Sequence, residues 1–180
     1  MILPVVTFGH DILRQKAKPV AEITDEVRQL VGDLLESMYA AKGVGLAAEQ
    51  VGRTESVCVI DVPRDAEKEE CREGNAAVPM PLVLINPEIT ASEGKQRNEE
   101  GCLSFPEIGA PITRADKVTV DYTDREGVRR TATARGLLSR AIQHEIDHLH
   151  GVLLVDKMSP IQKMSVAGQL KRLQKNARAE

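Results

Sequence analysis

The segment HEIDH constrains this chain most, because it places two histidines and a glutamate on one short stretch. Residues four apart lie on one face of an α-helix, so His144 and His148 can direct both imidazoles at one metal ion. Glu145 follows the first ligand and can reach a water on the metal without binding the metal itself. Leu137 and Ala141 extend the same face. The motif therefore predicts a helix that holds a metal ion against an apolar stripe.

The residues around this motif predict a helix over 136–149, which Gly151 closes. A second helix is predicted after Thr24, because Thr24 can cap it and apolar residues then recur at helical spacing. That helix should end where Gly43 supplies a left-handed residue. Ser159, followed by a proline, predicts the start of a C-terminal helix.

Strand signals in the rest of the chain are short and separate. Rich in β-branched and apolar residues, the predicted strands cover 56–62, 82–89, 117–123 and 127–134. The last two should form a hairpin. The glycine-rich segment 43–52 and the polar segment 65–77, with an exposed Cys71, should be loops. This order predicts an α+β fold in a single domain over residues 1–180, with small mixed or antiparallel sheets packed around a central metal-binding helix, an N-terminal helix and a C-terminal helix.

Composition and net charge limit the class of protein and the cellular location that the sequence predicts. The net charge of -3 argues against a generally basic nucleic-acid binder. No stretch approaches the roughly 20 apolar residues of a membrane span, and the N-terminal segment does not have the pattern of a secretory signal. The three cysteines are too few and too scattered for a disulfide framework. We expect a reduced, cytoplasmic location with no membrane partner.

Two histidines do not complete a catalytic metal site, which needs a third ligand and one position for water. Asp156 is a candidate downstream of the motif. Upstream, Cys102 lies in EGCLSFP, where Gly101 permits close approach of the backbone and a thiolate suits zinc or ferrous iron. A lone cysteine otherwise predicts a small buried hydrophobe, as we expect for Cys58. Spacing alone leaves the third ligand open, and it also leaves open a chance match to the motif.

Three segments together narrow these alternatives. GVGLAAEQVG, EGCLS and QHEIDHLHG occur in this order, and they resemble the three signature motifs of the peptide deformylase family. The resemblance extends through the flanking strands and the C-terminal helix. It implies that the metal ligands are Cys102, His144 and His148. It also implies catalytic roles for Glu145 as general acid and base, for the side chain of Gln50, and for the backbone N–H of Leu103. The implied substrate-binding residues are Val44, Gly45, Leu46, Leu137 and Ala141.

The function that the resemblance implies is removal of the N-terminal formyl group from formyl-methionyl peptides and nascent chains. The implied cofactor is one divalent metal ion. Ferrous iron is the expected native ion, and zinc, nickel or cobalt can occupy such a site. Methionine at the first position of the substrate needs an apolar pocket, for which Val44, Leu137 and Ala141 are expected walls.

Two positions depart from the family pattern, and one charged position needs a partner. Glu49 stands where the family most often has proline, and we expect its carboxylate to be solvated. Gly109 falls where some members carry an arginine that contacts the peptide backbone. By analogy with a similarly placed arginine in the family, Arg114 is expected to pair with Asp147, unless Asp147 is solvated.

Rival functions remain at this point. One is an endopeptidase of the HExxH kind, against which the missing downstream ligand and the presence of Cys102 both speak. Another is a structural metal site, or a degenerate homologue that binds formylated peptides without turnover. The basic C-terminal stretch, residues 169–180, predicts a solvated helix face, with a contact to ribosomal RNA as the sharper hypothesis.

Overall fold

The computed structural model describes residues 1–179. In chain order, its helices and strands are α1 (Asp25–Ala40), β1 (Gly45–Ala47), β2 (Val57–Ile60), α2 (Glu69–Asn75), β3 (Leu82–Glu93), β4 (Gln96–Cys102), β5 (Phe105–Arg114), β6 (Lys117–Thr123), β7 (Arg129–Arg135), α3 (Gly136–Leu149), α4 (Pro160–Ser165) and α5 (Ala167–Ala179). Short 3-10 turns cover Asp11–Arg14, Ala48–Val51, Arg64–Ala66 and Leu154–Lys157.

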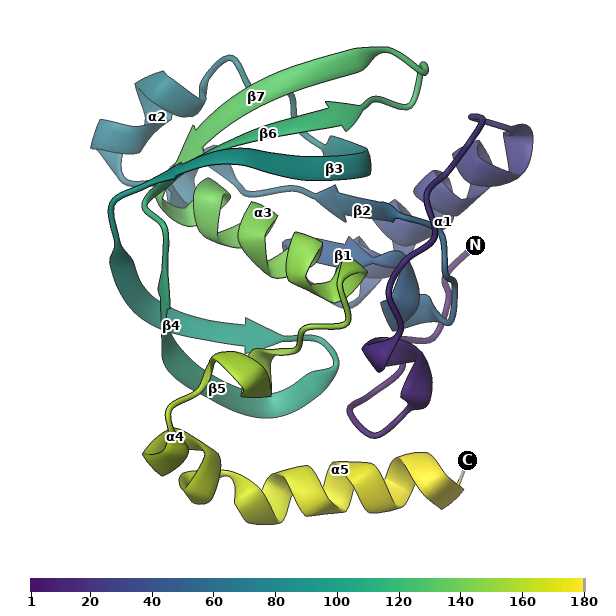
Figure 1. Ribbon diagram of the computed structural model, residues 1–180, viewed down its shortest axis with the longest axis vertical. Helices are drawn as coiled ribbons and strands as arrows, with labels where there is room; N and C mark the ends of the chain where they lie inside the picture. The colour runs from purple at the N-terminus through teal and green to yellow at the C-terminus, as the bar shows by residue number, and fades with distance from the viewer. Residues whose placement is uncertain (180) are drawn as a thin grey trace.

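Two antiparallel sheets enclose the helix α3. The larger sheet has the strand order β1-β2-β3-β6-β7, and β4 and β5 form a separate two-stranded hairpin. Figure 1 shows α3 between the five-stranded sheet and this hairpin, with α5 along the outer side of the hairpin. The α+β architecture predicted from the sequence is confirmed, with α3 as its central element.

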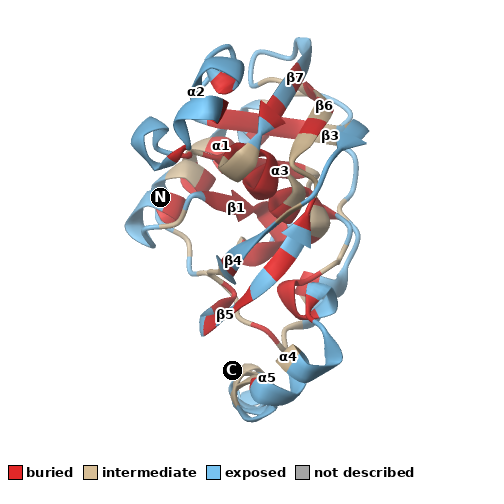
Figure 2. Cartoon of the chain, turned by 90° about the vertical axis from the view of Figure 1, so that its left-hand side faces the viewer, coloured by how far each residue is buried: buried red, intermediate tan, exposed pale blue. Residues whose placement is uncertain are grey.

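The buried position of α3 follows from its sequence. Gly136 begins the helix with a φ of +59°, and Gly151 follows its end with a φ of +71°. Leu138 and Ile142 are completely buried on the face toward the larger sheet. Figure 2 shows α3 as a buried element, whereas α5 is largely exposed. The predicted bounds, 136–149, match the observed helix.

The apolar residues form separate clusters, and the two sides of α3 differ. The apolar side chains of α3 pack with those of β2, β3, β6 and β7. The apolar side chains of the β4–β5 hairpin, such as Phe105 and Ile112, pack instead with the segment after α3, including Leu153 and Leu154. A third cluster joins α1 to β1, β2 and β3. The helix and the hairpin therefore belong to different apolar clusters.

Several local predictions are corrected by the structure. Lys42, not Gly43, takes the left-handed conformation after α1, with a φ of 57°. Part of segment 43–52 is the strand β1, which pairs with β2. Segment 65–77 contains the helix α2, and its Cys71 is buried against Gly136 instead of being exposed.

The C-terminal region differs from its prediction in one respect. Ser159 caps a helix as predicted, since its hydroxyl accepts a hydrogen bond from the backbone N–H of Gln162. That helix ends at Ser165, and α5 begins after Val166. Within residues 1–179, no helix is both long enough and apolar enough to cross a membrane.

Candidate metal centre

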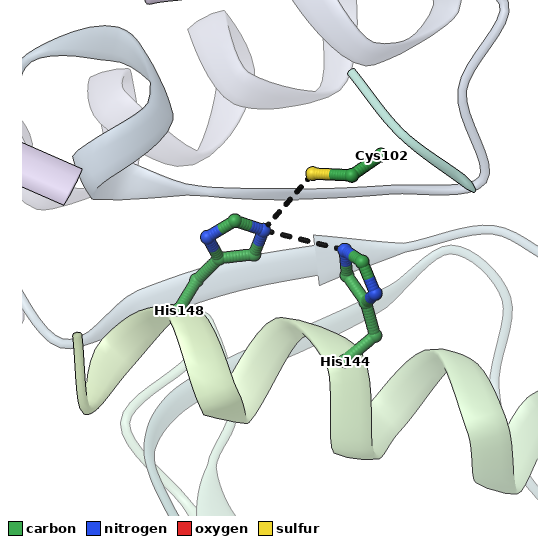
Figure 3. A group of neighbouring side chains, drawn as sticks. All are labelled: Cys102, His144 and His148. Atoms are coloured by element: carbon green, nitrogen blue, oxygen red, sulfur yellow. Dashed lines mark hydrogen bonds between the residues drawn. The ribbon is translucent and has the colours of Figure 1, made fainter. Parts of the chain in front are cut away.

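Cys102, His144 and His148 converge at one point between the hairpin and α3 (Figure 3). The Nε2 atom of His148 lies 3.3 Å from the Sγ atom of Cys102 and 3.3 Å from the Nε2 atom of His144. Tetrahedral zinc with usual bond lengths separates such ligand atoms by about 3.3–3.6 Å. The three donor atoms therefore fit one metal ion and leave a fourth position free.

The alternative third ligand, Asp156, is engaged elsewhere. Its carboxylate accepts hydrogen bonds from the guanidinium of Arg14 and from the backbone N–H of Leu153. Cys102 instead lies at the end of β4, next to the two-residue bend that leads into β5. The structure thus brings together the cysteine and the two histidines, and it leaves Asp156 outside the site.

Glu100 orients one of the two histidines. Its Oε2 atom lies 2.8 Å from Nδ1 of His144, so that Nε2 of His144 faces the other ligands. Burial alone would raise the pKa of Glu100, but hydrogen bonds from His144 and Arg114 lower that pKa far below its usual range. An ionised acceptor places the proton of His144 on Nδ1 and frees Nε2 to bind a metal. Nδ1 of His148 has no such partner among the residues that the structure describes.

Two buried arginines surround the Glu100 carboxylate. Arg114 donates to both of its oxygens, over 3.1 Å and 2.6 Å. Arg140 donates from Nη1 to Oε1 over 2.7 Å. Arg114 also pairs with Asp147, which confirms the pairing expected from the sequence. The negative charges of Glu100 and Asp147 thus balance the two guanidinium groups, as buried charges require.

Glu145 faces the cleft from the same helix, and its residue is 4% exposed. Burial is the main cause that raises the pKa of its carboxyl group to about 7. Its Oε2 atom has no hydrogen-bond partner in the described part of the chain. Gly45 lies directly against this carboxylate, and a Cβ atom there would collide with it. A carboxyl group with this environment suits proton transfer near neutral pH.

Gln50 is held in the turn that follows β1. Its Oε1 atom accepts a hydrogen bond of 3.0 Å from the backbone N–H of Ala47. Its Nε2 atom donates to the hydroxyl of Ser104 over 3.1 Å and lies 3.6 Å from Sγ of Cys102. An amide group has two N–H donors, so one is directed to Ser104 and the other to the metal ligand Cys102, beside the metal site. Leu103 occupies the bend directly after Cys102.

A cleft of about 720 Å³ opens beside the metal ligands. Among the predicted substrate-binding residues, those that line it are Val44, Gly45, Leu137 and Ala141. Leu46 does not line this cleft, because its side chain is completely buried in the cluster around α1. A second cavity, of about 690 Å³, lies between the loop before β3 and the β6–β7 hairpin, away from the ligands.

Glu49 contradicts the expectation of a solvated carboxylate. The residue is 0% exposed, and neither of its carboxylate oxygens has a hydrogen-bond partner within residues 1–179. The pKa of Glu49 is raised to about 8, mainly by burial and to a lesser extent by the charge of Glu145. Its short 3-10 turn packs against α3, which turns the side chain inward.

Sequence patterns did not reveal Arg140 or Ser104 as parts of the site. Arg140 lies one helical turn before His144, a spacing that could have suggested a shared face. Ser104 and Glu100 flank Cys102 within one segment, but their contacts with Gln50 and His144 join residues more than 40 positions apart. Such contacts depend on the tertiary packing.

Comparison with known proteins agrees with this geometry. The family model described as "Polypeptide deformylase" matches residues 2–164. The chain is 42% identical over 174 residues to the peptide deformylase of Nitrosococcus oceani, covering 97% of each chain. It is 43% identical over 175 residues to that of Acidobacterium capsulatum, again with 97% of each covered.

Solved structures show the same likeness. A peptide deformylase from Ehrlichia chaffeensis superposes with a TM-score of 0.88 at 33% identity, over 99% of this chain and 98% of that one. One from Legionella pneumophila gives 0.83 at 36% identity, over 100% of this chain and 99% of that one.

Proposed function

This chain belongs to the peptide deformylase family, whose members are metallo-hydrolases that remove N-formyl groups from nascent polypeptides. On that basis we propose a role for each residue of its site. The observation that supports the assignment best is the convergence of Cys102, His144 and His148 on one point. An HExxH endopeptidase is thereby rejected as the function. The proposed catalytic unit is a single domain over residues 1–180.

The three ligands suit a divalent metal ion that activates water and polarises the formyl carbonyl. Glu145 is the general base that takes the proton of the attacking water, and it then gives that proton to the departing amine. Its raised pKa, caused by burial, matches both tasks. The bond between the formyl carbon and the amine nitrogen breaks, and the products are formate and a free N-terminus.

Gln50 and Leu103 stabilise the oxyanion that forms on the formyl oxygen. The Nε2 atom of Gln50 donates to Ser104 and to Sγ of Cys102, and the second, long hydrogen bond is the one that gives way to the formyl oxygen. The backbone N–H of Leu103 is the second donor. Such preorganised donors contribute about 10²–10³ in rate each. The contacts of Gln50 with Ala47 and Ser104 hold its amide in place before the substrate binds.

The cleft is proposed to bind the first residues of a formyl-methionyl chain. Val44, Leu137 and Ala141 are the walls of the pocket for the methionine side chain. Gly45 gives the substrate backbone access beside Glu145. Leu46 contributes only through its backbone, because its side chain is buried away from the cleft.

Ferrous iron is the proposed native metal, and zinc, nickel or cobalt can replace it, since a thiolate with two imidazoles accepts each of these ions. Anaerobic purification followed by elemental analysis tests the identity of the ion. A ferrous site should lose activity in air as Cys102 is oxidised. If the anaerobic protein carried zinc and no iron, the iron proposal would be wrong.

The decisive assay is release of formate from formyl-Met-Ala by the anaerobically purified enzyme. Glu145→Gln should abolish nearly all turnover while the metal content stays unchanged. Full activity in this variant would overturn the role of Glu145. Cleavage of internal peptide bonds, without release of formate, would overturn the assignment as a deformylase.

A contact with the ribosome is a further part of the proposal, and it places the enzyme in the cytoplasm. The support is a cluster of exposed basic side chains on α5: Lys171, Arg172, Lys175 and Arg178. Neutralisation of phosphates by such side chains makes binding to RNA sensitive to salt. Reversing the charges of Lys171, Arg172 and Lys175 should abolish ribosome binding, whereas Lys95→Glu in the loop between β3 and β4 should not. Equal binding by both variants would exclude this surface.

A further inference from the structure

The ligands of the metal site come from two parts of the molecule whose buried apolar residues belong to different clusters. His144 and His148 lie on α3, whose apolar residues pack toward the five-stranded sheet. Cys102 lies on the β4–β5 hairpin, whose apolar residues pack toward the C-terminal segments. The geometry of the site therefore depends on whatever fixes the hairpin against α3.

Charged and polar side chains connect these two parts through hydrogen bonds and ion pairs. We call this group the polar seam, and its members are Glu100, Arg114, Arg140, His144 and Asp147. Glu100 and Arg140 are 7% and 4% exposed, so their hydrogen bonds are shielded from water. Within a buried network, such bonds are stronger than at the surface, and a group without its partner is costly.

Arg140 is the member of the polar seam that connects α3 to both strands of the hairpin. Its Nη1 atom donates to Oε1 of Glu100 in β4 over 2.7 Å. Its Nη2 atom donates to the backbone carbonyl of Ile112 in β5 over 2.8 Å. Glu100 precedes Cys102 by two residues and also accepts from His144. One guanidinium thus bridges the helix of the histidine ligands and the strand of the cysteine ligand.

We propose that Arg140 is a positioning residue that sets the spacing between Cys102 and the two histidines, and so preorganises the site for its metal. The inference rests on the proposed function for the identity of the site. Arg140 needs no contact with the metal or the substrate for this role. It acts through Glu100, which holds Nδ1 of His144, and through the backbone of β5.

Arg114 does not make this role redundant. Arg114 belongs to the hairpin, and its bonds to Glu100 lie within that hairpin. Its one contact with α3 is the ion pair with Asp147, whose side chain is 22% exposed. Arg140 comes from α3 itself and donates to the backbone carbonyl of Ile112, which is not among the hydrogen-bond partners of Arg114. A planar guanidinium can serve two acceptors at fixed angles, which an ammonium group cannot.

A purely structural role would have a different signature. If Arg140 only stabilised the fold, its loss would lower the unfolding temperature and leave the affinity of the folded protein for metal unchanged. A positioning role requires that metal affinity falls in protein that is still folded. Residues that orient metal ligands usually contribute 10–100-fold to affinity.

The test compares Arg140→Met and Arg140→Lys with the wild-type chain and with Arg130→Met. Arg130 forms an ion pair with Asp124 at the surface, so its replacement removes the same charge away from the site. The dissociation constant for Co(II) is measured by chelator competition, and the thiolate-to-Co(II) absorption band reports the geometry. The tautomer of His144 in the metal-free protein is followed by nitrogen NMR.

We expect Arg140→Met to weaken Co(II) binding about 10–100-fold and to shift the absorption band. Arg140→Lys should recover part of the affinity, since it restores the charge but only one of the two contacts. Arg130→Met should bind as the wild type does. An unchanged Co(II) affinity and an unchanged band in both Arg140 variants would overturn the proposal.

Two further measurements distinguish a loss of positioning from a failure to fold and from a failure of the proposed function. If Arg140→Met does not fold, Arg140→Lys still decides the question, because its unfolding and its Co(II) affinity are measured on the same sample. Release of formate by the wild-type enzyme tests the proposed function independently. A wild type that binds Co(II) without releasing formate would contradict the function and leave the positioning role intact.

Discussion

Gly45 of β1 lies so close to the carboxylate of Glu145 that no side chain fits between them. The edge strand of the larger sheet and the metal-binding helix meet at this point. On the side of β1, the Glu145 carboxylate is therefore bordered by backbone atoms alone. This leaves room for substrate beside it. The glycine in this motif is explained by close packing, since its φ is not in the left-handed region.

Replacement of Gly45 by alanine should displace the Glu145 carboxylate and reduce kcat by about 100-fold, because a misplacement of about 1 Å costs that much in catalysis. The change is measured by formate release at saturating metal. Gly32→Ala in α1, where a Cβ atom meets nothing within 4 Å, is the control. It should keep full activity and gain roughly 0.5–1 kcal/mol of stability. Normal kcat in Gly45→Ala would contradict the packing argument.

Glu49 should make the folded protein less stable as the pH rises. Burial raises the pKa of its carboxyl group to about 8 in the folded state, against an ordinary value near 4.5. Its stabilising contribution is therefore complete below the ordinary pKa and is lost progressively up to about pH 8. The loss amounts to about 1.4 kcal/mol for each pH unit.

Glu49→Gln should remove this dependence and be more stable than the wild type at pH 8, with little difference near pH 4. Chemical denaturation at several pH values measures the effect. Glu126→Gln, on the exposed hairpin turn, should follow the wild-type curve. Parallel curves for Glu49→Gln and the wild type would show that Glu49 is ionised in the folded protein.

Replacement of Glu100 by glutamine should destabilise the protein by about 3–5 kcal/mol, because Arg114 and Arg140 then lose a buried counter-charge. Denaturant unfolding measures this loss. The exposed neighbour Glu99 provides a matched control, and Glu99→Gln should change stability by less than about 0.5 kcal/mol. Equal effects in the two variants would mean that the polar seam is not held together by the Glu100 charge.

Replacement of Gln50 by alanine should lower kcat about 10²–10³-fold through loss of an oxyanion donor. Ser104→Ala should have a smaller effect, since it removes only the hydroxyl that orients the Gln50 amide. Steady-state kinetics of formate release separate the two variants. A larger loss in Ser104→Ala than in Gln50→Ala would show that the hydroxyl itself takes part in the reaction.

Local patterns predicted those elements whose burial has a regular period. The helical spacing of Leu137, Ala141, His144 and His148 identified α3 with its correct bounds. The β-branched and apolar residues of segment 117–123 and the turn at Asp124 likewise identified the β6–β7 hairpin, and the alternating burial of β6 agrees with them. In each case one face of the element is apolar, and the period of that face is visible in the sequence.

Other elements have no such period. β4 is almost entirely polar and mostly exposed, and only Glu100 within it is buried. The strand forms because it pairs with β5, not because its residues favour a sheet. The short helix α2 is held through Asn75, whose side chain donates to the backbone carbonyl of Arg135 and accepts from its backbone N–H. A partner 60 residues away cannot be identified from a local pattern.

The sequence by itself determined which residues form the site: the two histidines, the glutamate between them and, through the resemblance to a family, the cysteine that completes it. Their identities and order are enough, because metal coordination demands particular atoms. Only the tertiary structure decided that Glu49 is buried and that Arg140 joins the helix to the hairpin. The sequence shows which side chains can carry a charge, but the partner of each one and its exposure to water depend on which surfaces the fold brings together.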